Sequence, residues 1–201
     1  MLLDSDMTRL WLVRHGETNW NLEGRYQGTT DIPLNAKGRS QAKALGQVLA
    51  ANGVPFQAVF SSPLSRARET AGIIARCLDL PVFVDKRLEE INLGEWEGEL
   101  FIDIREKFPE IVGERLTNAA NTRTPGGESA VEVARRVVDA ADLIASCHSE
   151  EEVILVGHGF SLSVLAAIAN GKSLDAVYTS LLPHTDPLVI EWNPSRQNSD
   201  G

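Results

Sequence analysis

The chain has 201 residues, of which 43% are hydrophobic and 23% are charged. This length and composition are typical of an ordinary globular protein with a sizeable core. The formal net charge is −9, which disfavours a nucleic-acid partner, because phosphate backbones select basic surfaces. Any site for an anion must therefore be a local cluster of cations.

The N-terminal stretch and the cysteines bear on the cellular location of the protein. The stretch MLLDSDMTRL has no long apolar core, so it does not resemble a signal peptide. No run approaches the roughly 18 apolar residues of a membrane span. Cys77 and Cys147 lack the spacing of a metal or redox pair. We expect a cytoplasmic protein that does not bind membranes, and the choice between monomer and homodimer stays open.

Predicted strands and helices alternate in the first half of the chain. In chain order they are a strand over 9–13, a helix over 35–52, a strand over 58–61, a helix over 62–78 and a strand over 82–85. The strands are rich in Val, Ile, Leu and Phe without polar alternation, which is typical of a parallel sheet buried on both faces. Ser62 is expected to cap the second helix, with Pro63 in its first turn.

The second half continues the alternation after an interruption. In chain order it contains a short helix over 99–108, helices over 128–147 and 159–170 around a strand over 153–156, and an edge strand, Leu188–Trp192. Residues 92–125 have no obvious strand and are interpreted as a lid insertion, and 194–201 as a loose tail. Such alternation implies crossovers that place helices on both faces. The predicted fold is one α/β domain, a three-layer α/β/α sandwich whose mostly parallel sheet has one antiparallel edge strand.

Three predicted strands are followed by residues suited to an anion. The first ends in Arg14-His15-Gly16, the second leads to Arg66 in the next helix, and the fourth ends in Gly157-His158-Gly159. The carboxyl ends of parallel strands meet at one edge of a sheet, where ligands bind. Because two arginines and two histidines repel one another, we expect a negative group among them.

Phosphate, or a phosphate ester, is the anion that this arrangement favours. Two guanidinium groups can bind its oxygens in forked geometry. The helix N-termini after Ser62 and Gly157 are expected to attract it as well. Gly16 and Gly159, next to the histidines, are expected to leave room for its approach.

Cleavage of an ester needs a nucleophile and a proton donor for the leaving oxygen. Either histidine can be the nucleophile, since the arginines favour its neutral form. The acid is Glu89 or Glu90, after the third strand, and the pattern does not separate them. Glu95, Glu97 and Glu99 are interpreted as lid or surface charges. Neither a nucleotide-binding glycine loop nor a metal motif is present, so we predict no metal and no cofactor.

Five motifs occur in the order LVRHGETNWNLEGRYQGTTDIPLNAKGRSQA, FSSPLSRARETA, LEEINLGEWEG, PGGES and VGHG. With them, residues 9–192 resemble the histidine phosphatase superfamily, also called the phosphoglycerate-mutase-like family. The resemblance implies that His15 is the nucleophile and becomes phosphohistidine. It also implies that Glu90, four residues before Gly94, is the general acid.

The resemblance implies a phosphate pocket as well. Its residues would be Arg14, Asn21, Gln27, Arg66, His158 and Gly159. GEWEG and PGGES look like the phosphatase branch, and residues 91–125 carry seven acids against four bases, the opposite of what a bisphosphoglycerate cofactor would favour. We expect a metal-independent phosphomonoesterase for small phosphate esters. The alternatives are a cofactor-dependent phosphoglycerate mutase and a dedicated enzyme such as α-ribazole phosphatase. An inactive phospho-ligand binder is disfavoured, because His15, Glu90 and His158 are all present.

Two departures from the family pattern leave the choice of ester open. The tract GERLTNAANTRTPGG lacks the tryptophan that many relatives have before the PGGES-like turn. His184 lies in LLPHTDP, where relatives often have Asn. Tyr26 is a candidate for the substrate mouth, whereas Trp20 and Trp96 are either walls of the site or core.

Overall fold

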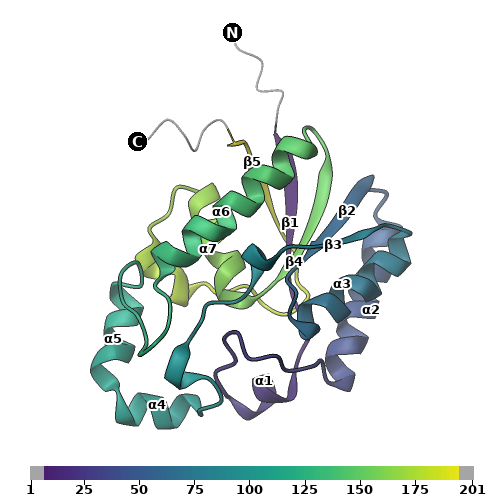
Figure 1. The fold of residues 1–201 in the computed structure, drawn as a ribbon. Coiled ribbons are helices and arrows are strands. Elements are labelled where there is room, and N and C mark those ends of the chain that lie inside the picture. Colours follow the sequence, from purple (N-terminus) through teal and green to yellow (C-terminus); the bar gives the residue numbers. More distant parts are fainter. Residues whose placement is uncertain (1–6, 195–201) are drawn as a thin grey trace.

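The computed structural model describes residues 7–194, and its centre is a five-stranded sheet (Figure 1). The strands are β1 (Thr8–Arg14), β2 (Phe56–Ser61), β3 (Val82–Val84), β4 (Glu152–Gly157) and β5 (Leu188–Trp192), in the spatial order β3-β2-β4-β1-β5. Strands β1 to β4 pair in parallel, and β5 is antiparallel to β1. The mixed sheet with one antiparallel edge strand is therefore confirmed.

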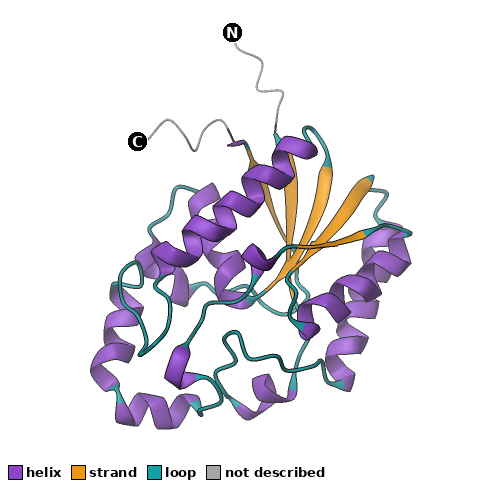
Figure 2. Ribbon diagram, viewed as in Figure 1, coloured by secondary structure: helices purple, strands orange, loops and turns teal. Residues whose placement is uncertain are grey.

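Four long helices connect the strands, close to the predicted ranges (Figure 2). They are α2 (Ala36–Ala51), α3 (Ser65–Leu78), α6 (Ala130–Cys147) and α7 (Gly159–Ala169). Local capping explains where two of them begin. The side chain of Asn35 accepts a hydrogen bond from the Gly38 amide, and Ser129 forms a capping box with Glu132.

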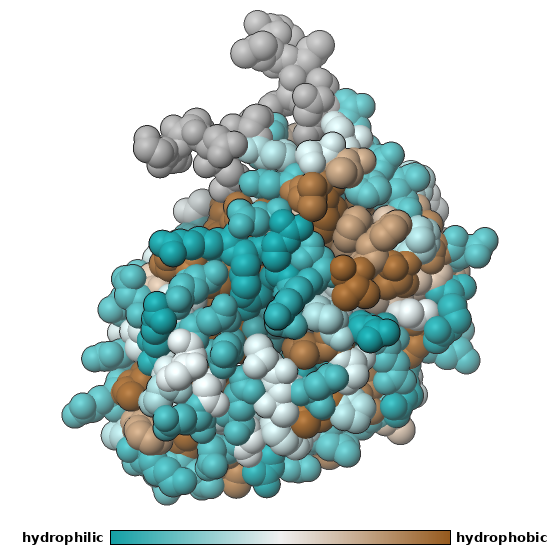
Figure 3. All heavy atoms as spheres, in the orientation of Figure 1, coloured by the Kyte–Doolittle hydropathy of each residue, from teal (hydrophilic) through white to brown (hydrophobic). Residues whose placement is uncertain are grey.

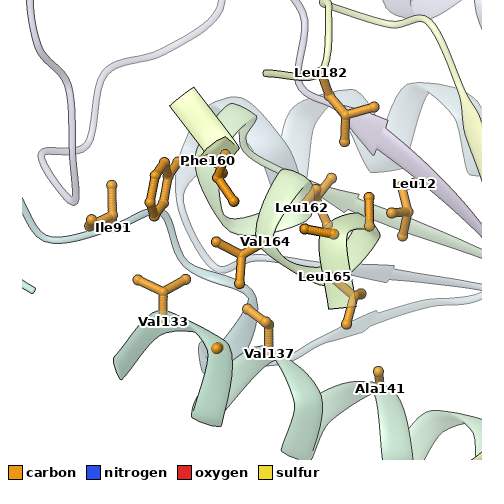
Figure 4. Packing of buried hydrophobic residues seen from close by; sticks show 14 of the residues in the cluster. Leu12, Ile91, Val133, Val137, Ala141, Phe160, Leu162, Val164, Leu165 and Leu182 are labelled. Atoms are coloured by element: carbon orange, nitrogen blue, oxygen red, sulfur yellow. The ribbon is translucent and has the colours of Figure 1, made fainter. Parts of the chain in front are cut away.

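Each face of the sheet has its own core. On β1, Leu10 and Leu12 belong to the cluster under α6 and α7, whereas Val13 belongs to the cluster under α2 and α3. The alternation follows from the two-residue period of a strand. In Figure 4, Val133 and Val137 of α6 face the side chains of α7. Helices thus cover both faces, as the predicted three-layer sandwich requires.

Two details differ from the prediction. Helix α3 begins at Ser65, with Leu64 and not Ser62 at the N-cap. The Ser62 hydroxyl instead accepts a hydrogen bond from the Leu64 amide within a turn. Strand β3 is short and exposed, because no further strand among the described residues pairs with its outer edge. Hydrophobic atoms accordingly gather at the surface over this edge (Figure 3).

The 92–125 segment contains two helices, where only one, over 99–108, was predicted. After the 3-10 turn η2 (Gly94–Trp96), α4 (Phe101–Lys107) ends before Phe108 and α5 (Pro109–Thr117) begins at a proline. Proline disrupts the interior of a helix but suits its first turn, so it separates the two. Both helices lie beyond the carboxyl ends of the parallel strands (Figure 1).

The remaining helical elements are α1 (Asn19–Glu23) and the 3-10 helices η1 (Lys86–Leu88) and η3 (Leu174–Thr179). Helix α1 was not predicted. Apart from Pro194, the predicted tail 194–201 lies outside the described residues. Within residues 7–194, no helix is long and apolar enough to cross a membrane.

Candidate active site

The pairing of β1 with β4 brings the two predicted histidines together. Arg14 is opposite Gly157 in the parallel register, and the His15 amide donates to the Gly157 carbonyl at 3.0 Å. His15 and His158 follow directly, and their ring centroids are 5.2 Å apart. The predicted convergence at the sheet edge is therefore present, although the two residues lie far apart in the sequence.

A cavity of about 130 Å³ opens at this edge. Every predicted site residue except His158 lines it, namely Arg14, His15, Asn21, Gln27, Arg66, Glu90 and Gly159. The fully buried His158 lies behind His15. Tyr26 also lines the cavity, as predicted, whereas Glu89 does not. Trp96 is buried core, packed against the Tyr26 ring.

A hydrogen bond fixes one nitrogen of the His15 ring. Its Nδ1 lies 2.7 Å from the Gly16 carbonyl oxygen, which can only accept, so Nδ1 carries the proton. Burial, together with the charges of Arg66, His184 and Arg14, lowers the pKa of His15 well below its ordinary value. The ring is therefore neutral at physiological pH, and Nε2 keeps its lone pair, as a nucleophile must.

Main-chain carbonyls, and not carboxylates, hold the two arginines. Arg14 donates to the Leu182 carbonyl at 2.9 Å, and Arg66 donates to the carbonyls of Thr30 at 2.8 Å and Gly28 at 2.7 Å. Burial lowers the pKa of Arg14, and that of Arg66 to about 10, so both stay charged at neutral pH. Within residues 7–194, their buried Nε atoms have no hydrogen-bond partner. The pair therefore has charge and donors available for an anion.

His158 is fixed by Ser62. Its Nε2 lies 2.8 Å from the Ser62 hydroxyl, while its buried Nδ1 has no partner among the described residues. Burial, followed by the charge of Arg66, lowers the pKa of His158 well below the ordinary value. The neutral ring can accept the Ser62 proton at Nε2 and offer an N–H at Nδ1.

Main-chain amides orient the Glu90 carboxylate. Its oxygens accept hydrogen bonds from Ile91 at 3.0 Å, Phe160 at 3.0 Å and Ser161 at 2.9 Å. From α6, Arg136 holds the Glu90 carbonyl at 2.9 Å. The side chain is thus fixed beside the cavity that it lines.

The sequence predicts that both helix N-termini attract the ligand anion, but carboxylates of the protein accept hydrogen bonds from amides at each of them. The first-turn amides of α7 bind Glu90, and the Ser65 amide of α3 donates to the Asp31 carboxylate at 2.7 Å. Helix N-termini attract anions, but here the protein's own carboxylates occupy them. The positive charge that attracts a ligand anion therefore comes mainly from Arg14 and Arg66.

The glycines also serve a purpose that differs from the predicted one. A Cβ at Gly16 would lie 2.4 Å from the Gly38 carbonyl oxygen, and one at Gly159 would lie 3.0 Å from the Arg14 guanidinium carbon. Gly16 therefore lets α2 approach the end of β1. The absence of a side chain at Gly159 makes room for the Arg14 guanidinium group.

Glu97 is interpreted from the sequence as a lid or surface charge, but in the structure its carboxylate holds a loop of the site by hydrogen bonds. Its carboxylate accepts hydrogen bonds from the amides of Thr29, Thr30 and Leu93. Burial alone would raise its pKa, but the hydrogen bonds from Thr30, Thr29 and Leu93 outweigh burial and lower the pKa. Glu97 thereby fixes the loop whose carbonyls hold Arg66.

Asn21 and Gln27 share one partner. The Thr18 hydroxyl lies 3.0 Å from the Asn21 side-chain oxygen and 3.0 Å from that of Gln27. Thr18 also caps α1. Thr18, at the start of α1, therefore ties together two side chains that line the cavity.

Arg115 and Tyr178 line the cavity as well, and the sequence did not single them out. An isolated arginine in a polar tract carries no signal of burial, because only the packing of α5 against η3 places it there. Within residues 7–194, no group of three or more His, Cys, Asp or Glu is arranged to hold a metal ion.

Residues 10–200 match the family model of the histidine phosphatase superfamily, branch 1. The chain belongs to this superfamily. It is 37% identical over 181 residues to a metal-independent phosphoserine phosphatase of Arabidopsis thaliana, covering 87% of this chain and 76% of the relative. It is 34% identical over 165 residues to a probable phosphoglycerate mutase, GpmB, of Salmonella paratyphi B, covering 82% of this chain and 76% of the relative.

A solved structure supports the same assignment. Bacillus stearothermophilus YhfR superposes with a TM-score of 0.83 at 36% identity, over 92% of each chain. Fold, family and relatives agree with the motif-based resemblance. This histidine phosphatase is a phosphoric monoester hydrolase, as expected from its sequence.

Proposed function

We propose that the protein hydrolyses small phosphate monoesters through a phosphohistidine on His15. The observation that carries the proposal is the hydrogen bond from His15 Nδ1 to the Gly16 carbonyl, 2.7 Å long, in a ring that lines the cationic cavity. Nε2 attacks phosphorus and forms a P–N bond while the bond to the leaving oxygen breaks. Water then attacks the phosphohistidine, the P–N bond breaks, and inorganic phosphate leaves.

Residues around His15 offset the charge of the transferring group. Arg14 and Arg66 bind its oxygens through their free N–H groups, and His158 donates from Nδ1. Asn21, Gln27 and the backbone at Gly159 complete the phosphate pocket. The cations offset the negative charge in the transition state, so we expect turnover without a metal ion or another cofactor.

Glu90 serves as the general acid and then as the general base. It protonates the leaving oxygen in the first step and takes a proton from the attacking water in the second. Its position supports this role, because Glu90 lines the cavity that contains His15 and three amides hold its carboxylate in place.

Water, and not a second hydroxyl of the substrate, is the proposed acceptor of the phosphoryl group. A mutase must protect its phosphoenzyme from water and retain a doubly phosphorylated intermediate. In this chain the segment that would cover the site has seven acids against four bases over 91–125. None of these seven acids lines the cavity, whose lining includes Arg25 and Arg115, so their charge acts on the approach to the site, where it disfavours a second phosphate.

Rapid quench tests the nucleophile. An acid-labile phosphoryl group should appear on His15, and His15→Ala should abolish turnover. His148→Ala, a matched control at the end of α6, should retain the wild-type rate. Recovery of the label on His158 would reverse the two roles.

The acid is tested by paired substitutions. Glu90→Gln should lower kcat by about 10²–10⁴-fold, as for a lost acid–base group, and Glu89→Gln should have little effect. p-Nitrophenyl phosphate, which has a good leaving group, should be affected less in the phosphorylation step. An active Glu90→Gln enzyme beside an inactive Glu89→Gln enzyme would contradict the assignment.

The reaction type is tested with 3-phosphoglycerate, with and without 2,3-bisphosphoglycerate and a chelator. We expect release of inorganic phosphate that the chelator does not reduce. Cofactor-stimulated isomerisation with negligible phosphate release would establish a mutase instead.

We further propose one catalytic domain, with the 92–125 segment as its lid, that acts in the cytoplasm. The free thiols of Cys77 and Cys147 suit a reducing compartment.

A further inference from the structure

One arginine binds the main chain of the segment that carries the proposed general acid. Arg136, on α6, donates to the Glu89 carbonyl at 2.6 Å and to the Glu90 carbonyl at 2.9 Å. It also donates to the Arg87 carbonyl at 2.8 Å. Its Nε and Nη2 atoms donate to the two carboxylate oxygens of Glu128, both at 3.1 Å. These hydrogen bonds occupy every N–H group of a guanidinium.

Glu128 binds the chain just after the acid. Its carboxylate accepts a hydrogen bond from the Asn92 amide at 2.8 Å, and its own amide donates to the Asn92 carbonyl at 2.8 Å. Glu128 is the glutamate of PGGES, a motif to which the proposed chemistry assigns no role. Arg136 and Glu128, together called the clamp, therefore hold the main chain on both sides of Ile91.

Hydrogen bonds, and not apolar packing, hold the acid-bearing loop on the side of the clamp. The clamp lines a groove of about 400 Å³, and every residue that lines this groove is polar or charged. Glu90 lines this groove as well as the catalytic cavity, so it lies between the two. Removal of the clamp would leave the loop without apolar contacts to replace it on this side.

The packing of α6 against α7 determines where the clamp meets the acid. First-turn amides of α7 bind the Glu90 carboxylate, whereas Arg136 of α6 binds the Glu90 main chain. Val133 and Val137, which precede and follow Arg136 in α6, are buried and face α7 (Figure 4). The two helices therefore hold the carboxylate and the backbone of Glu90 in a fixed relation.

We propose that the clamp positions Glu90 for proton transfer to the leaving oxygen. The inference rests on the proposed function, in which Glu90 is the general acid. Arg136 lies outside the lining of the catalytic cavity, so it is a positioning residue and not a catalytic one. A general acid must lie within hydrogen-bond reach of the oxygen that it protonates, and a misplacement of about 1 Å can cost about 100-fold in rate. Loss of the clamp should therefore impair protonation of the leaving group and spare the binding of phosphate.

Two aryl esters with different leaving groups test the positioning. p-Nitrophenolate leaves readily without a proton, whereas phenolate depends on the acid, and kcat/KM reports the step in which either leaves. In Arg136→Met, kcat/KM should fall about 10–100-fold for phenyl phosphate and less than about threefold for p-nitrophenyl phosphate. Equal losses for the two esters would overturn the proposal, because a defect of folding or of the phosphate pocket affects both.

Arg136→Lys separates the geometry of the side chain from its charge, which also helps to lower the pKa of His158. Lysine keeps the charge on a single nitrogen and lacks the planar fork. The ratio of kcat/KM for phenyl phosphate to that for p-nitrophenyl phosphate should lie between the values of the wild type and of Arg136→Met. A wild-type ratio in Arg136→Lys would show that the charge suffices and would overturn the positioning role.

Arg135→Met is the matched control, since Arg135 is the exposed neighbour of Arg136 in α6; it should keep the wild-type ratio. Should Arg136→Met not fold, Glu128→Gln decides. It keeps the shape of the side chain and replaces one acceptor of the clamp with a donor, so the ratio should fall. A wild-type ratio in Glu128→Gln as well as in Arg136→Lys would contradict the proposal.

A double substitution separates this inference from the proposed chemistry. Glu90→Gln alone should lower the ratio, and the addition of Arg136→Met should change it by less than about twofold, because no acid remains to be positioned. An unchanged ratio in Glu90→Gln would refute the proposed acid. A lowered ratio in Glu90→Gln beside a wild-type ratio in Arg136→Met would refute the clamp alone. A further full loss in the double variant would show that Arg136 acts independently of Glu90, and would overturn the inference.

Discussion

The Nδ1 atom of His184 lies 2.6 Å from the main-chain carbonyl oxygen of His15. The carbonyl can only accept, so His184 donates. Next to it, the Thr185 amide donates to the Arg14 carbonyl at 3.0 Å. The loop before β5 therefore fixes the backbone on which the nucleophile stands. An asparagine at this position could make the same contact, since its side-chain amide can also donate.

His184→Ala should lower kcat/KM by up to about 10-fold, because a hydrogen bond of this kind contributes about 0.5–1.5 kcal/mol. His184→Asn should recover most of the rate, since its amide can donate to the same carbonyl. Steady-state kinetics on p-nitrophenyl phosphate measures both. Equal impairment of the two variants would show that the imidazole has another role.

The protein should lose stability as the pH falls below neutral. Burial, together with the charge of Arg14, lowers the pKa of His184 to about 4 in the folded state, against about 6.5 in the unfolded chain. Between these values the unfolded chain binds more protons, so the free energy of unfolding falls as the pH falls from about 6.5 to 4. His15 and His158, whose pKa values are also lowered, act in the same direction.

Denaturant midpoints at pH 7.5 and pH 5.0 test this linkage. The wild-type protein should lose more stability between these two pH values than His184→Asn, which has no imidazole to protonate at this position. Parallel losses would assign the acid sensitivity to other groups.

Ser62→Ala should weaken phosphate binding at the site. Without the hydroxyl, His158 loses the donor that keeps its proton at Nδ1. We expect kcat/KM to fall by about 10-fold and inhibition by vanadate to weaken. Nitrogen chemical shifts of the His158 ring should report the altered tautomer. Ser40→Ala, at an exposed position of α2, is the control, and a tautomer unaffected by Ser62→Ala would contradict the argument.

Glu97→Gln should loosen Arg66 although the two side chains do not form an ion pair. The amide nitrogen of glutamine replaces one acceptor with a donor, so the Thr29–Thr30 loop loses a hydrogen bond. The carbonyls that hold Arg66 then shift. The inhibition constant for inorganic phosphate should rise by about 10-fold. Glu99→Gln, at a half-buried position whose carboxylate pairs with Lys107 at 3.6 Å, should leave it unchanged.

The strand ends could be predicted because buried parallel strands have an obvious composition, and because their carboxyl ends must meet. For that reason Arg14, His15, Arg66 and His158 were placed together from the sequence. The partners that hold them could not be predicted in the same way. The bonds from Arg66 to the Gly28 and Thr30 carbonyls depend on the path of a loop, which no periodic pattern encodes.

The start of helix α3 and the 92–125 segment also depend on tertiary contacts that could not be predicted from the sequence. Ser62-Pro63 has the composition of a helix start, but the hydroxyl of Ser62 is used by His158 instead, and α3 begins later. The burial of Arg115 depends on packing between α5 and η3, which are distant in the sequence. Tertiary contacts of this kind are settled by the whole fold and not by local preference.

The β1–β4 register has a consequence for how the protein acquires activity during folding. His15 comes from one end of the sequence and His158 from near the other, and they meet only when these two strands pair. Closing a chain segment of this length is entropically costly and slow compared with forming the local helices. A refolding chain should therefore gain helical signal before it can bind phosphate. Recovery of phosphate binding would then mark the moment at which the two halves of the sheet join.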